Sequence, residues 1–176
     1  HGIWIGSLWA ITAIVGALGI PLSRVLFNGS SDGGYAFSKI LSWFAIGYIA
    51  FLIATIGVAP LALPAIVLAL LVWAAVNAFV FWRMRGRMTF LPRISQVAVA
   101  ELIFIAVCTG IVVVKGFHPE VYQIERFMDF GFIETLRNSS NLPLTDLWLA
   151  GETLNYYYMS HFIGFVILTL TGIPSV

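Results

Sequence analysis

The sequence predicts an all-α protein, a polytopic transmembrane helical bundle of about five spanning helices with a polar loop on one side. The chain is 60% hydrophobic and only 10% charged, whereas a soluble domain usually carries about 25% charge. Several apolar runs approach the roughly 20 residues that cross a bilayer. Six of the eight carboxylates lie between Glu120 and Glu152, so the polar chemistry is concentrated in one segment.

The composition also excludes some classes of protein. A soluble chain of 176 residues leaves too much surface in water to hide this apolar content, so membrane lipid is the expected partner. A net charge of +1 argues against nucleic acid, which requires a basic face. Cys108 is the single cysteine and forms no internal disulfide. We interpret 1–176 as one membrane domain. Because the chain begins at His1 rather than at Met and ends in an apolar run, we expect it to be the amino-terminal fragment of a longer chain, whose remaining helices it would contact.

Five stretches are predicted to span the membrane as helices, because lipid requires backbone groups to pair within a segment. They run from about Ile3 to Phe27, Ile40 to Val58, Leu61 to Trp82, Val97 to Lys115 and Tyr156 to Leu170. Gly19 and Pro21 predict a kink or an end in the first stretch. Pro60 and Pro64 predict a tight turn between the second and third.

Arginine placement predicts the orientation. The connection after the third stretch holds four of the nine basic residues, Arg83, Arg85, Arg87 and Arg93. Short loops rich in Lys and Arg stay in the cytoplasm. Alternation then places the loop at 28–39, flanked by Arg24 and Lys39, in the cytoplasm as well. The acidic and aromatic loop at 116–155 is therefore predicted to be extracytoplasmic.

The segment from Glu125 to Arg137 in that loop is predicted to be a short interfacial helix, with aromatic rings toward the lipid boundary. Glu125 and Asp129 have i,i+4 spacing, which stacks both carboxylates on one helix face. Two close carboxylates suit a divalent metal or a shared-proton base. The alternative is a solvated helix face partly neutralised by Arg126 and Arg137, and spacing alone favours it.

Asp146 and Glu152 form a second acidic pair around Trp148 in TDLWLAGE. Asp146 precedes an apolar triplet, so it is also suited to capping a short turn. Trp148 fits an ordinary aromatic belt, because Trp gathers at headgroup level. On sequence alone, a structural role for these residues, as a turn cap and an aromatic belt, is favoured over a role in a site.

Asn155 precedes three consecutive tyrosines, Tyr156–Tyr158, at the predicted start of the fifth stretch. Three successive positions cover most of a helix circumference, so a lipid-facing belt does not explain them all. Tyr157 and Tyr158 come within a turn of His161, and ionisable residues just inside a membrane usually face a cavity. Contact with a phosphate or sugar hydroxyl and simple hydrogen-bonded packing both remain open here.

Glu101, near the start of the fourth stretch, is expected to reach the membrane surface or pair with Arg93 rather than act in catalysis. The sequence contains no P-loop, dinucleotide fingerprint, HExxH or zinc-finger spacing. Three scattered histidines, His1, His118 and His161, do not make a metal site by count.

The runs IERFMDF, PLTDLWLAGETLNYYYMSHF and LTGIP resemble the conserved block of the YYY-type membrane proteins, the DUF2298 or chloroarchaeal YYY family. That family typically shows E-K-P-M-D-F, P-P-x-D-x-W-x-A-G and N-Y-Y-Y-x-G-x, and the upstream runs DGGYAFSKILSWF and AELIFIAV are similar as well. The chain departs from the pattern at Arg126-Phe127, Leu144-Thr145 and Ser160-His161. The resemblance implies the cytoplasmic membrane of an archaeon or bacterium.

The family is similar to the GT-C membrane glycosyltransferases, which use lipid-phosphate-linked sugars and carry acids on an outer loop. The resemblance implies transfer of a sugar from a polyprenyl-phosphate-linked donor, with Asp129 or Glu125 as catalytic base or as ligands of a divalent cation, Mg²⁺ or Mn²⁺. Residues implied to contact substrate are Asp146, Trp148, Glu152, Asn155, Tyr156, Tyr157, Tyr158 and His161.

Two other classes of function stay open. A non-catalytic membrane scaffold or assembly subunit would use the same outer loop to dock a partner, with Trp148 and the tyrosines as anchors. A transporter would require ionisable groups near the bilayer midplane, and the sequence favours it least.

Overall fold

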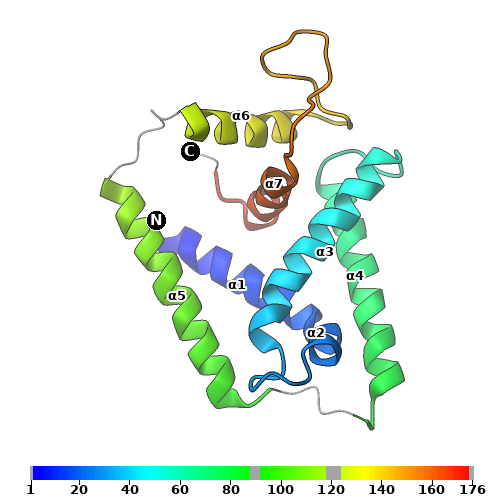
Figure 1. The fold of residues 1–176 in the computed structure, drawn as a ribbon, viewed down its shortest axis with the longest axis vertical. Helices are drawn as coiled ribbons and strands as arrows, with labels where there is room; N and C mark the ends of the chain where they lie inside the picture. The colour runs from blue at the N-terminus through cyan, green and yellow to red at the C-terminus, as the bar shows by residue number, and fades with distance from the viewer. Residues whose placement is uncertain (1, 88–91, 118–123, 175–176) are drawn as a thin grey trace. The chain divides into compact units, whose positions relative to one another are not determined.

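A computed structural model describes residues 2–87, 92–117 and 124–174. Seven helices lie in these ranges (Figure 1): α1 Gly2–Leu18, α2 Ile20–Leu26, α3 Tyr35–Thr55, α4 Leu63–Met84, α5 Ile94–Phe117, α6 Ile124–Asn138 and α7 Met159–Thr171. An isolated antiparallel bridge pairs Thr145 with Thr153. The predicted all-α class is confirmed.

Helices α3, α4 and α5 are 21, 22 and 24 residues long and apolar enough to cross a membrane. Helices α1 and α2 qualify as a fourth span if the bent pair is counted as one. The predicted fifth span needs correction: α7 has only 13 residues, short of the roughly 20 that a bilayer requires. It begins at Met159 rather than at Tyr156, and it ends at Thr171, just before Gly172, whose φ of 67° is left-handed.

The kink expected in the first stretch is present as a 60° bend between α1 and α2. Gly19 lies at the break because a Cβ there would come within 2.1 Å of the Ser42 hydroxyl. The backbone N–H of Leu22 donates to Asn77 Oδ1 of α4 at 3.1 Å. A side chain thus satisfies a donor that the interrupted helix leaves without an intrahelical acceptor.

The described residues form two compact units, His1–Trp43 with Val72–Pro119 and Phe44–Leu71 with Glu120–Val176. The long helices α3 and α4 contribute to both. The bent pair, α5 and the Asn77 contact belong to the first unit. The acidic and aromatic segment, with α6 and α7, belongs to the second.

In the second unit, α6 and α7 lie side by side (Figure 1). Phe132 and Leu136 of α6 and Phe162 of α7 are fully buried. The Phe162 ring contacts Phe51 of α3 edge-on, with centroids 5.6 Å apart. Glycine at position 47 permits the close approach of α7, because a Cβ there would lie 2.8 Å from Ile163 Cγ1. This packing places the first turns of α7 against the middle of α6.

Candidate functional site

Asp129 of α6 and His161 of α7 form a close contact between ionisable groups in the second unit. The distance from Asp129 Oδ1 to His161 Nε2 is 2.7 Å. The imidazole is 12% exposed and the carboxylate 54% exposed. With Nε2 protonated, the imidazole donates to the carboxylate, which fixes the tautomer of a neutral ring. The second ring nitrogen, Nδ1, lies 3.5 Å from the Ser160 hydroxyl, which is long for a hydrogen bond.

Phe132 lies at the centre of the residues around this pair. It comes three positions after Asp129, on the same face of α6, and its side chain is fully buried. Its ring centroid is 5.0 Å from that of His161, 5.3 Å from Tyr156 and 5.8 Å from Trp148. One buried ring therefore brings together residues predicted from three separate parts of the loop.

The tyrosine triplet is not helical, which corrects the expectation that it opens a spanning helix. The rings of Tyr156 and Tyr157 stack with centroids 4.1 Å apart, and the Tyr156 hydroxyl donates to that of Tyr157 at 2.9 Å. That hydrogen bond, followed by burial and by the charges of Tyr157, Asp129 and Glu125, raises the pKa of Tyr156. Tyr158 lies apart from this stack, with its ring edge-on to Phe51.

Asp146 organises the hairpin from Leu144 to Leu154. Its Oδ1 accepts hydrogen bonds from the backbone N–H of Trp148 at 2.8 Å and of Leu149 at 3.0 Å. The ends of the hairpin pair through the Leu154 N–H and the Leu144 carbonyl at 2.8 Å. Asp146 therefore caps a turn, as its structural interpretation expected. Glu152 and Asn155 are exposed.

Glu125 is in the first turn of α6 and is exposed. Across the described ranges, no three His, Cys, Asp or Glu side chains gather closely enough to hold a metal ion. Two carboxylates four residues apart are nevertheless a partial ligand set, because Mg²⁺ is usually held by one or two carboxylates together with substrate phosphates. His118 and Glu120 lie outside the described residues.

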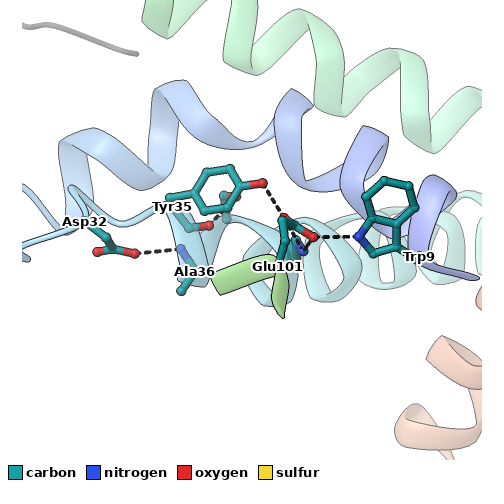
Figure 2. Close-up of polar contacts among 7 residues, drawn as sticks. Trp9, Asp32, Tyr35, Ala36 and Glu101 are labelled. Atoms are coloured by element: carbon teal, nitrogen blue, oxygen red, sulfur yellow. Dashed lines mark hydrogen bonds and ion pairs between the residues drawn. The ribbon is translucent and has the colours of Figure 1, made fainter. Parts of the chain in front are cut away.

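Glu101 has partners that differ from those expected, and they belong to the first unit. Its carboxylate lies 2.6 Å from Lys39 Nζ, not against Arg93. It also accepts from the Tyr35 hydroxyl at 2.5 Å and from Trp9 Nε1 at 2.8 Å, on two sides (Figure 2). The sequence did contain a signal for these partners. Tyr35 and Lys39 lie four residues apart in an apolar helix, and polar residues in such a helix usually pair with other polar groups inside the bundle.

A hollow of about 320 Å³ in the second unit was not predicted from the sequence. Leu61, Phe165, Leu168 and Ile173 supply apolar lining, and Arg137 and Thr169 supply polar lining. Arg137 and Thr169 each follow one member of the Asp129–His161 pair by eight residues. Eight residues of helix span about 12 Å, so the hollow and the pair lie at opposite ends of the α6–α7 contact.

Comparison with protein families matches residues 45–176 to a family described as "Uncharacterized membrane protein (DUF2298)". No curated protein and no solved structure matches the chain. The matched range contains the whole candidate site from Glu125 to His161 and also Glu101, but not Trp9, Tyr35 or Lys39. The family description gives a membrane location and names no activity.

Proposed function

The chain belongs to the DUF2298 family of membrane proteins, and we propose that it forms part of a GT-C-like glycosyltransferase. The reaction would move a sugar from a polyprenyl-phosphate-linked donor to an acceptor hydroxyl on the extracytoplasmic side. The observation that carries this proposal is the Asp129–His161 contact of 2.7 Å. A carboxylate held by an imidazole beside exposed aromatic rings combines a proton acceptor with surfaces that suit a sugar.

Asp129 is the proposed general base. One carboxylate oxygen is engaged by His161, and the side chain is 54% exposed, so the second oxygen is available to an incoming hydroxyl. The acceptor O–H gives its proton to Asp129 as its oxygen bonds to the anomeric carbon of the donor sugar. The bond from that carbon to the phosphate oxygen breaks, and the lipid phosphate leaves with the electron pair. A positioned base typically contributes about 10²–10⁴-fold to such a step.

His161 is the proposed positioning residue for Asp129. Its ring is largely buried and lies edge-on to Phe132, with the ring planes at 73°, so packing restricts its rotamer. Because the imidazole holds Oδ1, it also limits rotation of the carboxylate. Orienting the base in this way reduces the entropy lost on reaching the transition state.

Glu125 and Asp129 are the residues that would hold a divalent cation. Such an ion would offset the negative charge on the departing phosphate. The two carboxylates fit this role only if the donor phosphate supplies further oxygen ligands, so the proposal predicts that cation binding depends on the donor.

The test uses the full-length protein in phosphatidylcholine nanodiscs with a panel of polyprenyl-phosphate-linked hexoses and a mixture of acceptor glycosides. Asp129→Asn should lower turnover by about 10²–10⁴-fold with unchanged thermal stability. Glu134→Gln, on the same helix, is the matched control and should keep wild-type turnover. An Asp129→Asn protein that transfers sugar at the wild-type rate would remove Asp129 from the mechanism.

A second candidate is the scaffold, favoured by one observation. Leu147, Trp148 and Leu149 at the hairpin tip are 44%, 57% and 63% exposed, and an exposed apolar patch often marks a protein interface. A photo-crosslinking residue at Leu149 that captured one protein in stoichiometric yield from intact cells, together with absent transferase activity, would favour the scaffold.

A further inference from the structure

We propose that Trp148 and Tyr157 form a carbohydrate-binding platform and that the acceptor in the proposed reaction is itself a sugar. The acceptor role rests on the proposed function. The binding of a sugar ring rests on the arrangement of aromatic side chains alone, so the two claims are testable apart. Both rings come from segments that the buried Phe132 side chain holds together.

The platform rings are exposed although they are packed on one side. Trp148 is 57% exposed and Tyr157 78% exposed. Trp148 contacts Phe132 at an interplanar angle of 89°, and Tyr157 stacks on Tyr156 at 24°. One face of Tyr157 is therefore used in the stack, and the high exposure leaves the other face open to a ligand.

The position of these rings is fixed before any ligand binds. Trp148 is in the turn that Asp146 caps through two backbone N–H groups. Tyr157 is held by the ring stack and by the 2.9 Å contact between its hydroxyl and that of Tyr156. A surface that is already ordered loses little conformational entropy on binding, which distinguishes it from an apolar loop exposed by disorder.

The chemistry of the surface fits a pyranose. One face of a hexopyranose presents C–H groups that pack on an aromatic ring, while its hydroxyls point outward. The same segments also carry polar groups: the Tyr156 hydroxyl is bonded to that of Tyr157, the Asp129 carboxylate is held by His161, and the Asn155 side chain is exposed. Aromatic faces with a few polar groups around them are typical of sites for small polar ligands. A surface that only contacted lipid would not require these polar groups.

The platform also lies beside the proposed base. Phe132 contacts both Trp148 and His161, with centroids 5.8 Å and 5.0 Å from its own, and His161 holds Asp129. A sugar ring on the platform would therefore place a hydroxyl within reach of the carboxylate. This geometry indicates a sugar acceptor and not a lipid alcohol.

The experiment labels the full-length protein with 5-fluorotryptophan in phosphatidylcholine nanodiscs and observes the ¹⁹F resonance of Trp148, assigned by Trp148→Phe. The probes are methyl β-D-glucopyranoside and methyl α-D-mannopyranoside, with glycerol as a hydroxylated control that has no ring face. At least one glycoside should shift the Trp148 resonance and show saturation transfer to its ring C–H protons, whereas glycerol should do neither. Tyr157→Ala should weaken glycoside binding about tenfold, since an aromatic contact contributes up to about 1.5 kcal/mol.

Trp82→Ala is the matched control, because Trp82 has a similar exposed fraction, 58%, and belongs to the other unit. It should leave glycoside binding unchanged. Binding that persists in Asp129→Asn while turnover is lost supports both proposals, and binding without any transferase activity supports the platform alone. Absence of glycoside binding, equal binding in Tyr157→Ala, or broadening of the Trp148 resonance by paramagnetic lipid would each overturn the platform.

Discussion

Lys39 and Glu101 form an ion pair between two membrane-spanning helices, with Nζ 2.6 Å from Oε1 and side chains only 9% and 14% exposed. Lys39 also lies over the Phe104 ring, 4.5 Å from its centroid. Glycine at position 16 permits this packing, because a Cβ there would lie 2.6 Å from Lys39 Cγ. The pair and its hydrogen bonds join α1, α3 and α5 within the first unit.

Removing one partner of this pair should destabilise the protein strongly. Glu101→Ala leaves the Lys39 ammonium without its counter-ion in an apolar region, and breaking a buried pair costs about 3–5 kcal/mol. The double variant Lys39→Met with Glu101→Leu should recover most of that loss, because neither charge then remains. Unfolding in mixed micelles titrated with dodecyl sulfate measures both. Equal losses in the single and double variants would contradict a pairwise role.

Asn77 should stabilise the break between α1 and α2. Replacing it with Leu removes the acceptor for the Leu22 N–H, and an unsatisfied buried donor costs about 1–3 kcal/mol. Val76→Ala, at an exposed neighbouring position, is the control and should have a smaller effect. Faster amide exchange at Leu22 in the Asn77→Leu protein would locate the loss. Unchanged exchange there would show that the break is held by other contacts.

The helices were predictable wherever a periodic or continuous apolar signal exists. The helix expected from Glu125 to Arg137 is observed as Ile124–Asn138, because apolar residues recur there at i,i+3 and i,i+4. The bend at Gly19 followed from backbone chemistry that acts locally. By contrast, Tyr156–Tyr158 carry no period, so the sequence did not show that the helix begins only at Met159.

Side-chain partners were less predictable because they depend on packing between distant segments. Lys39 and Glu101 are separated by 62 residues, and the nearer cation in sequence, Arg93, was the wrong partner. His161 was selected as ionisable near a membrane, yet its contact with Asp129, 32 residues away, required the packing of α6 on α7. Residue type predicted that these ionisable side chains would have polar partners, but it did not identify the partners.

The turn before α3 should lose stability in acid. Burial alone would raise the pKa of Asp32, but hydrogen bonds from the Ala36 N–H, the Ser30 hydroxyl and the Gly34 N–H outweigh it and leave the pKa lowered; the Ala36 contact is drawn in Figure 2. The unfolded pKa of an aspartate is about 3.9. A carboxyl whose pKa is lower in the folded protein contributes its full stabilisation of the fold at pH values above the unfolded pKa. This contribution disappears as the pH falls through the folded pKa.

Comparison of wild type with Asp32→Asn isolates that contribution. The difference in unfolding free energy should be constant at neutral pH and should shrink once the pH falls below about 4. Detergent-micelle unfolding followed by circular dichroism at several pH values measures it. A difference that stays constant down to pH values far below that range would show that the carboxylate charge is not the source.

The side of the membrane occupied by the acidic and aromatic segment is the remaining premise of the proposed reaction. Arginine placement predicts that Asn141 faces the outside and that Ser95 faces the cytoplasm. Single cysteines at these two exposed positions, in a Cys108→Ala background, report the side directly. A membrane-impermeant maleimide should label Asn141→Cys in intact cells and should label Ser95→Cys only after permeabilisation. The reverse pattern would place Asp129 and His161 on the cytoplasmic side, where a donor presented at the outer surface does not reach them.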